Sequence, residues 1–267
     1  RCTLACQYCS ANSNPKVNDE YPLSELESML DTLEKYSVKH IFITGGEPLL
    51  HEDIDSIISS ISKRGMHIGM STNGELVNQE TLQRIYNAGL IEDIGVTLDG
   101  HTKDIHDKTR GKGSFANALK AMHHLNKFSK ISWGVNHISS QLNIGNAVAT
   151  AELAKRMGAD AINLIRVIPI GRGRRNKTKL WVEKDIFQRE FDELKSRYRF
   201  IGKYFDDCAI FSLSDPVEND NLSYLFDDDF PPYGISVLHT GNVFFTPPGL
   251  LLGNINEEPL ETLIDKL

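Results

Sequence analysis

The sequence predicts an α/β fold in which crossover helices cover a parallel β-sheet. Apolar, β-rich runs alternate with segments of helical periodicity along about the first 200 residues, an order typical of parallel strands joined by helices. The chain has 267 residues, 40% of them hydrophobic, which is enough to bury a full core. No apolar run approaches the roughly 18 residues that a membrane-spanning helix needs. An open doubly wound sheet and a whole or partial (β/α) barrel both satisfy this pattern.

The elements follow one another in a regular order. Residues 22–36 place apolar side chains at helical spacing, and residues 38–44 form an apolar run that ends at Gly45 and Gly46, as a buried strand does. The same reasoning predicts helices over 51–63, 78–88, 115–126, 145–157 and 183–198, and strands over 66–72, 93–98, 131–138 and 161–168. Five strands are therefore predicted, and a sixth is expected to precede Cys2 outside this sequence.

The pattern changes near residue 200. Residues 235–238 and 242–246 flank a His-Thr-Gly turn and predict a hairpin, and residues 260–267 predict a short helix. We expect a core domain over 1–200, whose first strand lies outside the sequence, and a small α+β extension over 201–267.

Charge and targeting signals narrow the class of protein. The formal net charge is -7, so the molecule as a whole repels a phosphate backbone and binding to nucleic acid is not expected. No signal-peptide pattern is present, which favours a cytoplasmic protein that does not contact a membrane. One stretch, 166–182, is basic and has no acidic residue. It is either a solvated loop or a site for an acidic peptide or a phosphate. Its cations are Arg166, Arg172, Arg174, Arg175, Lys177 and Lys179.

Three of the four cysteines lie within the first nine residues. Cys2, Cys6 and Cys9 form a C-x3-C-x2-C pattern, too crowded for a framework of disulfides. Three thiolates at these spacings can bind three irons of a cubane cluster and leave the fourth iron without a protein ligand. Zinc is the weaker alternative, because no second Cys/His pair of the usual spacing follows. The sequence therefore predicts one iron–sulfur cluster on this loop.

Six motifs in order resemble the radical SAM superfamily. The cysteine motif has an aromatic residue, Tyr8, before its third cysteine. GGEP stands at 45–48, STNG at 71–74, and TLDG at 97–100, where the family has SLDG. HD..RG..GSF at 106–115 and P-x-GRG at 169–173 resemble the peptide-modifying branch that carries SPASM or Twitch extensions. The resemblance covers residues 1–173 and, more loosely, 241–267.

The resemblance implies a fold and two cofactors. The fold is a partial (β/α)6 TIM-like barrel, and one 4Fe-4S cluster on Cys2, Cys6 and Cys9 lies with S-adenosylmethionine (SAM) at the mouth formed by the strand ends. The residues expected to contact SAM are Tyr8, Gly45, Gly46, Glu47, Pro48, Ser71, Asn73, Thr97, Asn136 and Val167.

Each of these residue types suits a particular part of SAM. The two glycines let the backbone approach a ligand closely, and the Glu47 carboxylate suits an ammonium group. We expect this carboxylate to contact the ligand and not to support the fold. Its removal should therefore leave an exposed turn, which Pro48 fixes. Ser71, Asn73 and Thr97 offer short polar groups for the SAM carboxylate or ribose, Asn136 for the ribose, and backbone near Val167 for the adenine. A helix cap or a turn is the commoner role of Ser71, Asn73 or Thr97 taken alone, and burial in a local hydrogen-bond network is the alternative for Asn136.

The resemblance also implies reductive radical chemistry. In this family the reduced cluster passes one electron to SAM, and the resulting 5'-deoxyadenosyl radical abstracts hydrogen from the substrate. A peptide or protein substrate and a reducing partner such as flavodoxin or ferredoxin are expected, as in a maturase of ribosomal peptides. The alternatives are a dehydrogenase or epimerase of a sugar or other small metabolite, and a non-catalytic cluster-binding protein. The intact GGEP opposes the last of these.

The C-terminal segment departs from the family. SPASM extensions carry further cysteines for auxiliary clusters, but here the only cysteine beyond residue 9 is Cys208. One thiolate does not hold a cubane in the ordinary way, so the resemblance implies a SPASM-like or Twitch-like extension without a recognisable auxiliary cluster motif, or one whose remaining cysteines lie beyond residue 267. Cys208 is a buried apolar side chain, a hydrogen donor to a substrate radical, or a lone auxiliary ligand.

Overall fold

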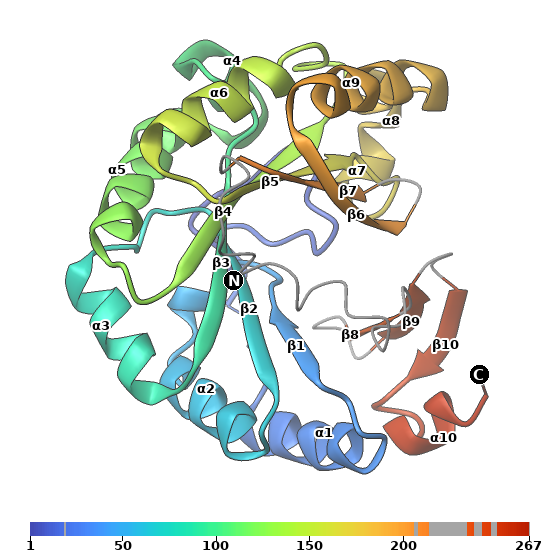
Figure 1. Cartoon of the computed structure of the whole chain (residues 1–267). Coiled ribbons are helices and arrows are strands. Elements are labelled where there is room, and N and C mark those ends of the chain that lie inside the picture. The colour runs from blue at the N-terminus through green and yellow to red at the C-terminus, as the bar shows by residue number, and fades with distance from the viewer. Residues whose placement is uncertain (19, 206–207, 214–233, 238–241, 247–249, 267) are drawn as a thin grey trace.

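The fold centres on a seven-stranded sheet that curves into half a barrel (Figure 1). A computed structural model of the chain describes residues 1–18, 20–205, 208–213, 234–237, 242–246 and 250–266. Neighbouring strands follow the order β1-β2-β3-β4-β5-β7-β6. Their bounds are β1 His40–Ile43, β2 His67–Thr72, β3 Ile91–Thr97, β4 Ser132–Ser139, β5 Ala161–Arg166, β6 Arg199–Phe205 and β7 Cys208–Ser212.

Helices connect the strands and cover the outer face of the sheet (Figure 1). β1 to β5 run parallel, so the predicted α/β fold with five parallel strands is confirmed. The helices are α1 Leu23–Lys35, the short 3-10 helix η1 Pro48–Leu50, α2 Ile54–Lys63, α3 Gln79–Ala88, α4 Lys103–Arg110, α5 Ser114–Lys127, α6 Ala147–Met157, α7 Arg172–Arg175, α8 Lys177–Leu180 and α9 Lys184–Arg197. Of these, α4, α7 and α8 were not predicted.

The hydrophobic core lies between the sheet and the outer helices. Ile68 on β2 and Ile94 on β3 are fully buried and belong to the same apolar cluster as Ile58 on α2 and Met122 on α5. Side chains alternate between the two faces of a strand. The intervening residues of the same strands therefore face the inside of the half-barrel.

The inner face of the sheet carries unusually little side-chain volume. Register places four small residues side by side on β2, β3, β4 and β5: Ser71, Gly95, Gly134 and Ala161. Interiors of complete (β/α) barrels are instead filled by branched apolar residues. On the same face, Phe42 of β1 is 53% exposed and lies where a side chain at Gly69 would touch it. This face is therefore not filled as a barrel core would be.

The chain after residue 200 forms two antiparallel units. β6 and β7, which were not predicted, extend the core sheet, because β7 pairs antiparallel with both β5 and β6. β8 Gly234–Val237, β9 Asn242–Thr246 and β10 Leu250–Asn254 form a second sheet. The predicted pairing of 235–238 with 242–246 is confirmed for the residues described there, whereas β10 is an addition.

The end of the chain packs on the first helix. α10 Leu260–Ile264 buries Leu263 in a cluster with Met29 and Leu33 of α1, and the Tyr36 hydroxyl donates to Asp265. Figure 1 accordingly shows the second sheet beside the β1 edge of the half-barrel. Since β6 and β7 continue the core sheet, the division at residue 200 does not coincide with an edge of that sheet. The two-domain division itself stays a prediction.

Candidate functional site

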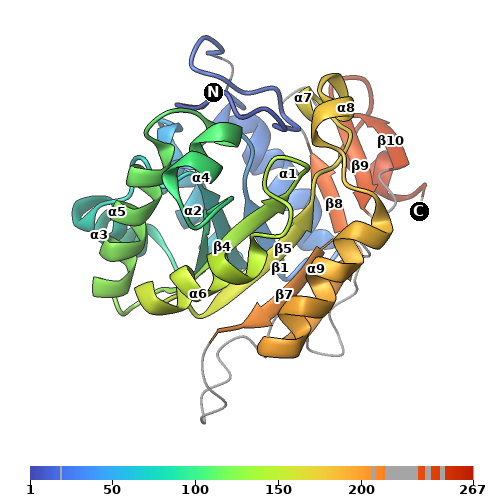
Figure 2. The ribbon, with the colours of Figure 1, turned by 90° about the horizontal axis from the view of Figure 1, so that it is seen from above.

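Residues 1–18 form a loop along one edge of the sheet, beside α7 and α8 (Figure 2). It carries Cys2, Cys6 and Cys9, and we call it the cysteine loop. Three segments that follow strands hold it in place: the loop after β1, helix α4 after β3, and the α7 segment after β5. The carboxyl ends of parallel strands meet at one edge, so motifs far apart in sequence converge on these cysteines.

The GGEP loop after β1 contacts the start of the cysteine loop. The Glu47 amide donates to the Arg1 carbonyl at 3.0 Å. A Cβ on Gly46 would lie 1.8 Å from the same oxygen, so only glycine permits this approach. Gly45 has a φ of +132° and open space beside it. Both glycines were expected to let the backbone approach a ligand. Gly46 instead approaches the Arg1 carbonyl, and Gly45 has open space beside it.

The Glu47 side chain is buried and engaged within the chain, which corrects the prediction of an exposed turn. It is 3% exposed and accepts hydrogen bonds from Thr72 Oγ1 at 2.8 Å, Asn73 N at 2.7 Å and Leu49 N at 3.3 Å. Burial raises its pKa, and these hydrogen bonds counteract part of that rise. Glu47 therefore ties the β1 loop to the end of β2, and Pro48 begins the short helix η1 as the turn prediction required.

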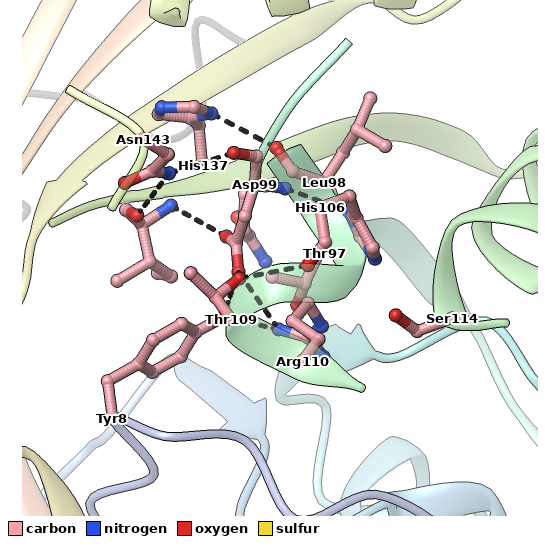
Figure 3. Close-up of polar contacts among 12 residues, drawn as sticks. Tyr8, Thr97, Leu98, Asp99, His106, Thr109, Arg110, Ser114, His137 and Asn143 are labelled. Carbon is pink, nitrogen blue, oxygen red and sulfur yellow. Dashed lines mark hydrogen bonds and ion pairs between the residues drawn. The ribbon is translucent and has the colours of Figure 1, made fainter. Parts of the chain in front are cut away.

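Tyr8 joins the cysteine loop to β3 and α4 through a buried charge pair (Figure 3). Its hydroxyl donates to Asp99 Oδ2 and accepts from Arg110 Nη1. Asp99 is fully buried and Arg110 is 7% exposed, and their charged groups stand 3.9 Å apart. Burial raises the pKa of Tyr8 well above its usual value, so the phenol stays neutral and bridges both charges.

The Asp99 carboxylate also connects this region to β4 and to α4. Asp99 Oδ1 accepts from the Ile138 amide at 3.1 Å and Oδ2 from the Thr109 hydroxyl at 3.0 Å. The Asp99 amide donates to His106 Nδ1 at 3.1 Å, and burial lowers the pKa of His106 to about 4. His106 is therefore a neutral acceptor that shapes the turn after β3.

The Asp107 carboxylate, next to His106 in sequence, stabilises the start of α5. Its carboxylate accepts from the amides of Gly113 and Phe115 and from the Ser114 hydroxyl. These bonds satisfy donors at the N-terminus of α5, and they outweigh burial and lower the pKa of Asp107. The HD..RG..GSF stretch is thus a brace that orders α4 and α5 and directs Arg110 to the cysteine loop.

The α7 segment closes over the other side of the cysteine loop. The Arg172 amide donates to the Cys9 carbonyl at 2.9 Å, and its guanidinium donates to the carbonyls of Cys6 at 2.7 Å and Ser13 at 2.6 Å. A Cβ on Gly171 would lie 2.6 Å from the Cys9 oxygen and 2.2 Å from that of Ser10. The GRG motif is therefore a close-packed clamp on the loop.

The three cysteines form a donor set that suits an iron–sulfur cluster. Cys2 and Cys6 are buried at 8% and 7% exposure, and Cys9 is partly exposed. Burial raises the pKa of the Cys2 and Cys6 thiols, and the charges of the neighbouring cysteines raise it further. Cys2 Sγ accepts from the Leu4 amide at 3.5 Å and from Asn73 Nδ2 at 3.7 Å. Hydrogen bonds to sulfur of this kind stabilise a thiolate ligand.

The grouping differs from a site for one ion. Among the residues that the structure describes, no three His, Cys, Asp or Glu side chains are grouped so that they could hold a single metal ion. A cubane places its irons at separate corners, so its ligands stand farther apart than those of one ion. Three thiols on one braced loop, with N–H groups directed at sulfur, therefore fit the cluster.

The polar residues expected to contact SAM lie in two groups. On the inner face, Asn136 Nδ2 donates to Ser71 Oγ at 3.0 Å and Asn163 Nδ2 donates to Asn136 Oδ1 at 2.7 Å. This chain crosses from β2 to β5, and its Asn163 Oδ1 is buried without a hydrogen-bond partner. At the strand end, Asn73 donates to Thr3 at 3.0 Å and Thr97 Oγ1 to the Thr72 carbonyl at 3.5 Å.

Backbone contacts locate the two remaining predicted site residues, Val167 and Cys208. The Val167 amide donates to the Ser139 carbonyl at 2.9 Å, so this amide is not free for an adenine. Cys208 opens β7, opposite Ile165 of β5, which puts its backbone toward the carboxyl end of the parallel strands. Its side chain lies outside what the structure describes, and its role stays a prediction.

Several residues that shape the site were not among the predicted ligands, although Arg172 was named as part of the basic run. Asp99, Arg110 and Arg172 stand within the quoted motifs, and each is a charged residue beside a glycine, a signal that could have found them. Asn163 lies inside an apolar strand, where a lone amide is a comparable signal. Of the basic run, Arg172 and Lys179 contact the cysteine loop, while Arg174 and Arg175 are exposed.

Comparison with known families decides the identity. Residues 1–162, more than half of the chain, match the radical SAM superfamily. The chain belongs to the radical SAM superfamily. This family implies an iron–sulfur cluster and SAM, for which the cysteine loop and the adjoining strand ends supply the candidate ligands.

Curated relatives of two kinds share this radical SAM region. Mycofactocin maturase MftC of Mycobacterium ulcerans is 30% identical over 172 residues, which cover 64% of this chain and 46% of that protein. An AdoMet-dependent heme synthase of Methanosarcina barkeri is 29% identical over 174 residues, 64% of this chain and 49% of that protein. The chain therefore spans about half the length of the curated relatives it matches.

Solved radical SAM structures share the fold over nearly the whole chain. Streptococcus suis SuiB bound to S-adenosylmethionine covers 98% of this chain at a TM-score of 0.66 and 15% identity, and this match spans 63% of SuiB. Native anSMEcpe with bound AdoMet covers 99% at a TM-score of 0.64 and 18% identity, over 78% of its own length. At these identities the likeness establishes the fold alone. In the described part of the chain, no helix is long and apolar enough to cross a membrane.

Proposed function

We propose that the chain is the catalytic core of a radical SAM enzyme that modifies a peptide. The observation that carries the proposal is the convergence of three strand-end segments on the cysteine loop, above an inner face lined by small and polar residues. Such a face leaves room for a substrate segment next to a cluster. A match to MftC, named a maturase, and a fold shared with SuiB bound to precursor peptide SuiA support a peptide substrate.

Roles for the chain's own residues follow from the geometry. Cys2, Cys6 and Cys9 hold one cluster, and SAM bound to it supplies a carbon radical that abstracts hydrogen. Asn73 and Thr97 at the strand ends, and the Ser71–Asn136–Asn163 chain on the inner face, offer amide and hydroxyl groups to SAM or substrate. Gly45 leaves open space for the SAM methionine moiety beside the loop. Glu47 positions Thr72 and Asn73, and Tyr8 positions the loop itself.

The test is anaerobic reconstitution with iron, sulfide, dithionite and SAM, followed by measurement of 5'-deoxyadenosine. With peptides encoded beside the gene as candidate substrates, we expect 5'-deoxyadenosine to rise and the mass of one peptide to change. SAM cleavage that responds to no peptide, but does respond to a small metabolite, overturns the peptide assignment. A cytoplasmic location and a reducing partner belong to the same proposal.

A second candidate is an enzyme of small molecules. The heme synthases match at 25 to 29% identity, close to the MftC values, so sequence similarity alone does not select the substrate. If this candidate is a redox-neutral epimerase, Cys208 is its hydrogen donor, because it is the one cysteine of the chain outside the loop. Turnover in heavy water then places deuterium in the product, and Cys208→Ala still forms 5'-deoxyadenosine without completing product. A product free of deuterium excludes that role.

A further inference from the structure

We propose that the α7–α8 segment, residues 168–179, is the docking surface for an acidic one-electron carrier protein. The inference rests on the proposed function, since only a cluster that takes up electrons needs such a partner. Four features of this segment carry it: its contacts with the cysteine loop, its unpaired positive charge, its exposed apolar residues, and its separation from the inner face of the sheet.

The segment is hydrogen-bonded to the cysteine loop along its length. Besides the Arg172 amide on Cys9, Asn176 Nδ2 donates to the Gln7 carbonyl at 2.8 Å and Lys179 Nζ to Gln7 Oε1 at 2.7 Å. Cys9 is also the least buried of the three cysteines. Electron transfer weakens steeply with distance, so a carrier reaches the cluster best where the loop is nearest to the surface.

The exposed charge of the segment is positive and unpaired. Arg174 and Arg175 are exposed, and neither guanidinium forms a hydrogen bond or ion pair with any residue that the structure describes. Lys177 and Arg166 stack on Trp181 at 5.3 Å and 4.6 Å from the ring centre, which holds the end of α8 in place. On a chain of net charge -7, this local field steers an acidic protein to this surface.

Apolar residues lie beside the charges. Ile168 and Ile170 are 41% and 38% exposed, and Pro169 stands between them. The Arg174 amide donates to the Ile170 carbonyl at 3.4 Å, so the two kinds of surface are adjacent. A small apolar centre with a charged rim suits a transient electron-transfer complex, whose interfaces are among the smallest known.

A carrier fits this surface better than an acidic peptide substrate does. A substrate must reach the inner face of the sheet, but in the described chain no hydrogen bond joins 172–179 to Ser71, Asn136 or Asn163. The bonds lead to the cysteine loop instead. In the proposed step one electron leaves the carrier and enters the cluster, so the carrier is oxidised by one electron and the cluster is reduced by one. No bond forms or breaks.

The experiment compares Arg174→Glu/Arg175→Glu with Lys120→Glu/Lys127→Glu. The control pair lies on the exposed face of α5 and changes the net charge equally. The probe is an acidic flavodoxin. Its binding in the oxidised form is measured by surface plasmon resonance, and reduction of the cluster by its reduced form is followed in an anaerobic stopped flow. Dithionite reduces a parallel sample.

We expect Arg174→Glu/Arg175→Glu to weaken flavodoxin binding and slow cluster reduction by about tenfold or more at low ionic strength. The α5 variant should match the wild type, and high salt should remove the difference. Arg174→Gln/Arg175→Gln should give an intermediate effect. Equal flavodoxin binding and reduction by all variants overturns the proposal, as does weakened binding of a substrate peptide with flavodoxin unaffected. The dithionite sample tests the proposed function independently of the docking surface. If dithionite reduces the cluster but SAM is not cleaved, the result contradicts the proposed function and not the docking surface.

Discussion

At the scale of single residues, buried polar groups hold the site together. Glu47, Asp99 and Arg110 are each less than 10% exposed, and each reaches a segment that is distant in sequence. Burying a charge is costly unless it is hydrogen-bonded, and here the bonds go to the loops that surround the cysteines. The motifs GGEP, TLDG and RG thus supply the supports of the cysteine loop as well as candidate ligand contacts.

The pH dependence of stability tests the position of Glu47. Folding raises the pKa of this carboxyl above its usual 4.5, so the folded chain binds its proton more tightly than the unfolded chain. Its contribution is largest below pH 4.5 and is lost as the pH rises through the folded-state pKa. Glu47→Gln lacks this titration. The wild type should therefore lose stability relative to Glu47→Gln over that window, as measured by urea unfolding of the metal-free protein. Parallel stability curves would show that folding does not raise the pKa of Glu47.

A double-mutant cycle tests the bridge between Tyr8 and Arg110. Tyr8→Phe and Arg110→Met each remove a partner from a buried network, and each should lower the free energy of unfolding by about 1 to 3 kcal/mol. Because the two groups share one hydrogen bond, the double variant should lose less than the sum, with a coupling of about 1 kcal/mol or more. Tyr8→Phe combined with Arg84→Met, whose guanidinium pairs with Asp55 on the outer helices, should be additive. Additivity in both cycles contradicts the bridge.

At the scale of elements, the sequence was most informative where periodicity and burial coincide. All five parallel strands and the helices α1, α2, α3, α5, α6 and α9 lie at their predicted places, because each has an apolar face that packs on the core. Helix α4 was missed since its sequence KDIHDKTR has no apolar stripe. Its buried residues include His106, Thr109 and Arg110. These are polar side chains that hydrogen bonds stabilise in the interior, so no hydrophobic pattern reveals them.

The strands β6 and β7 were missed for a different reason. β7 pairs antiparallel with both β5 and β6, and the register between β6 and β7 is irregular, whereas the sequence pattern predicted only parallel strands in the core. The site shows the same limit. The cysteine pattern indicated the cluster loop, but the burial of Glu47 and the pairing of Ser71 with Asn136 depend on which strands lie side by side, which a sequence without its fold does not contain.

The glycine clamp after β5 gives a prediction at this scale. Gly171 and Gly65 both have positive φ, +56° and +68°, so alanine at either costs about 1 kcal/mol or more of backbone strain. Only Gly171 also faces the carbonyls of Cys9 and Ser10. Gly171→Ala should therefore displace the cysteine loop and bind less iron per chain after reconstitution, whereas Gly65→Ala should bind as much as the wild type. Equal iron contents in the two variants would show that the close packing at Gly171 is not needed for cluster binding.

At the scale of the whole molecule, helices cover the outer face of the half-barrel, and small and polar residues line its inner face. The carboxyl edge carries the cysteine loop, braced by segments after β1, β3 and β5 (Figures 1 and 2). The second sheet and α10 are anchored on α1, at the opposite edge of the half-barrel from β6. The cysteine loop thus lies within the region that matches the superfamily, and the second sheet and α10 lie beyond that region.

The central claim is that the braced cysteine loop carries a cluster that cleaves SAM. The most direct measurement is 5'-deoxyadenosine formed under anaerobic conditions by reconstituted protein with dithionite and SAM, beside iron and sulfide analysis of the same samples. The wild type should bind one four-iron cluster and form 5'-deoxyadenosine, while Cys2→Ala/Cys6→Ala/Cys9→Ala should bind none and form none. A full cluster or continued SAM cleavage in the triple variant, or a wild-type cluster that dithionite reduces without forming 5'-deoxyadenosine, would contradict it.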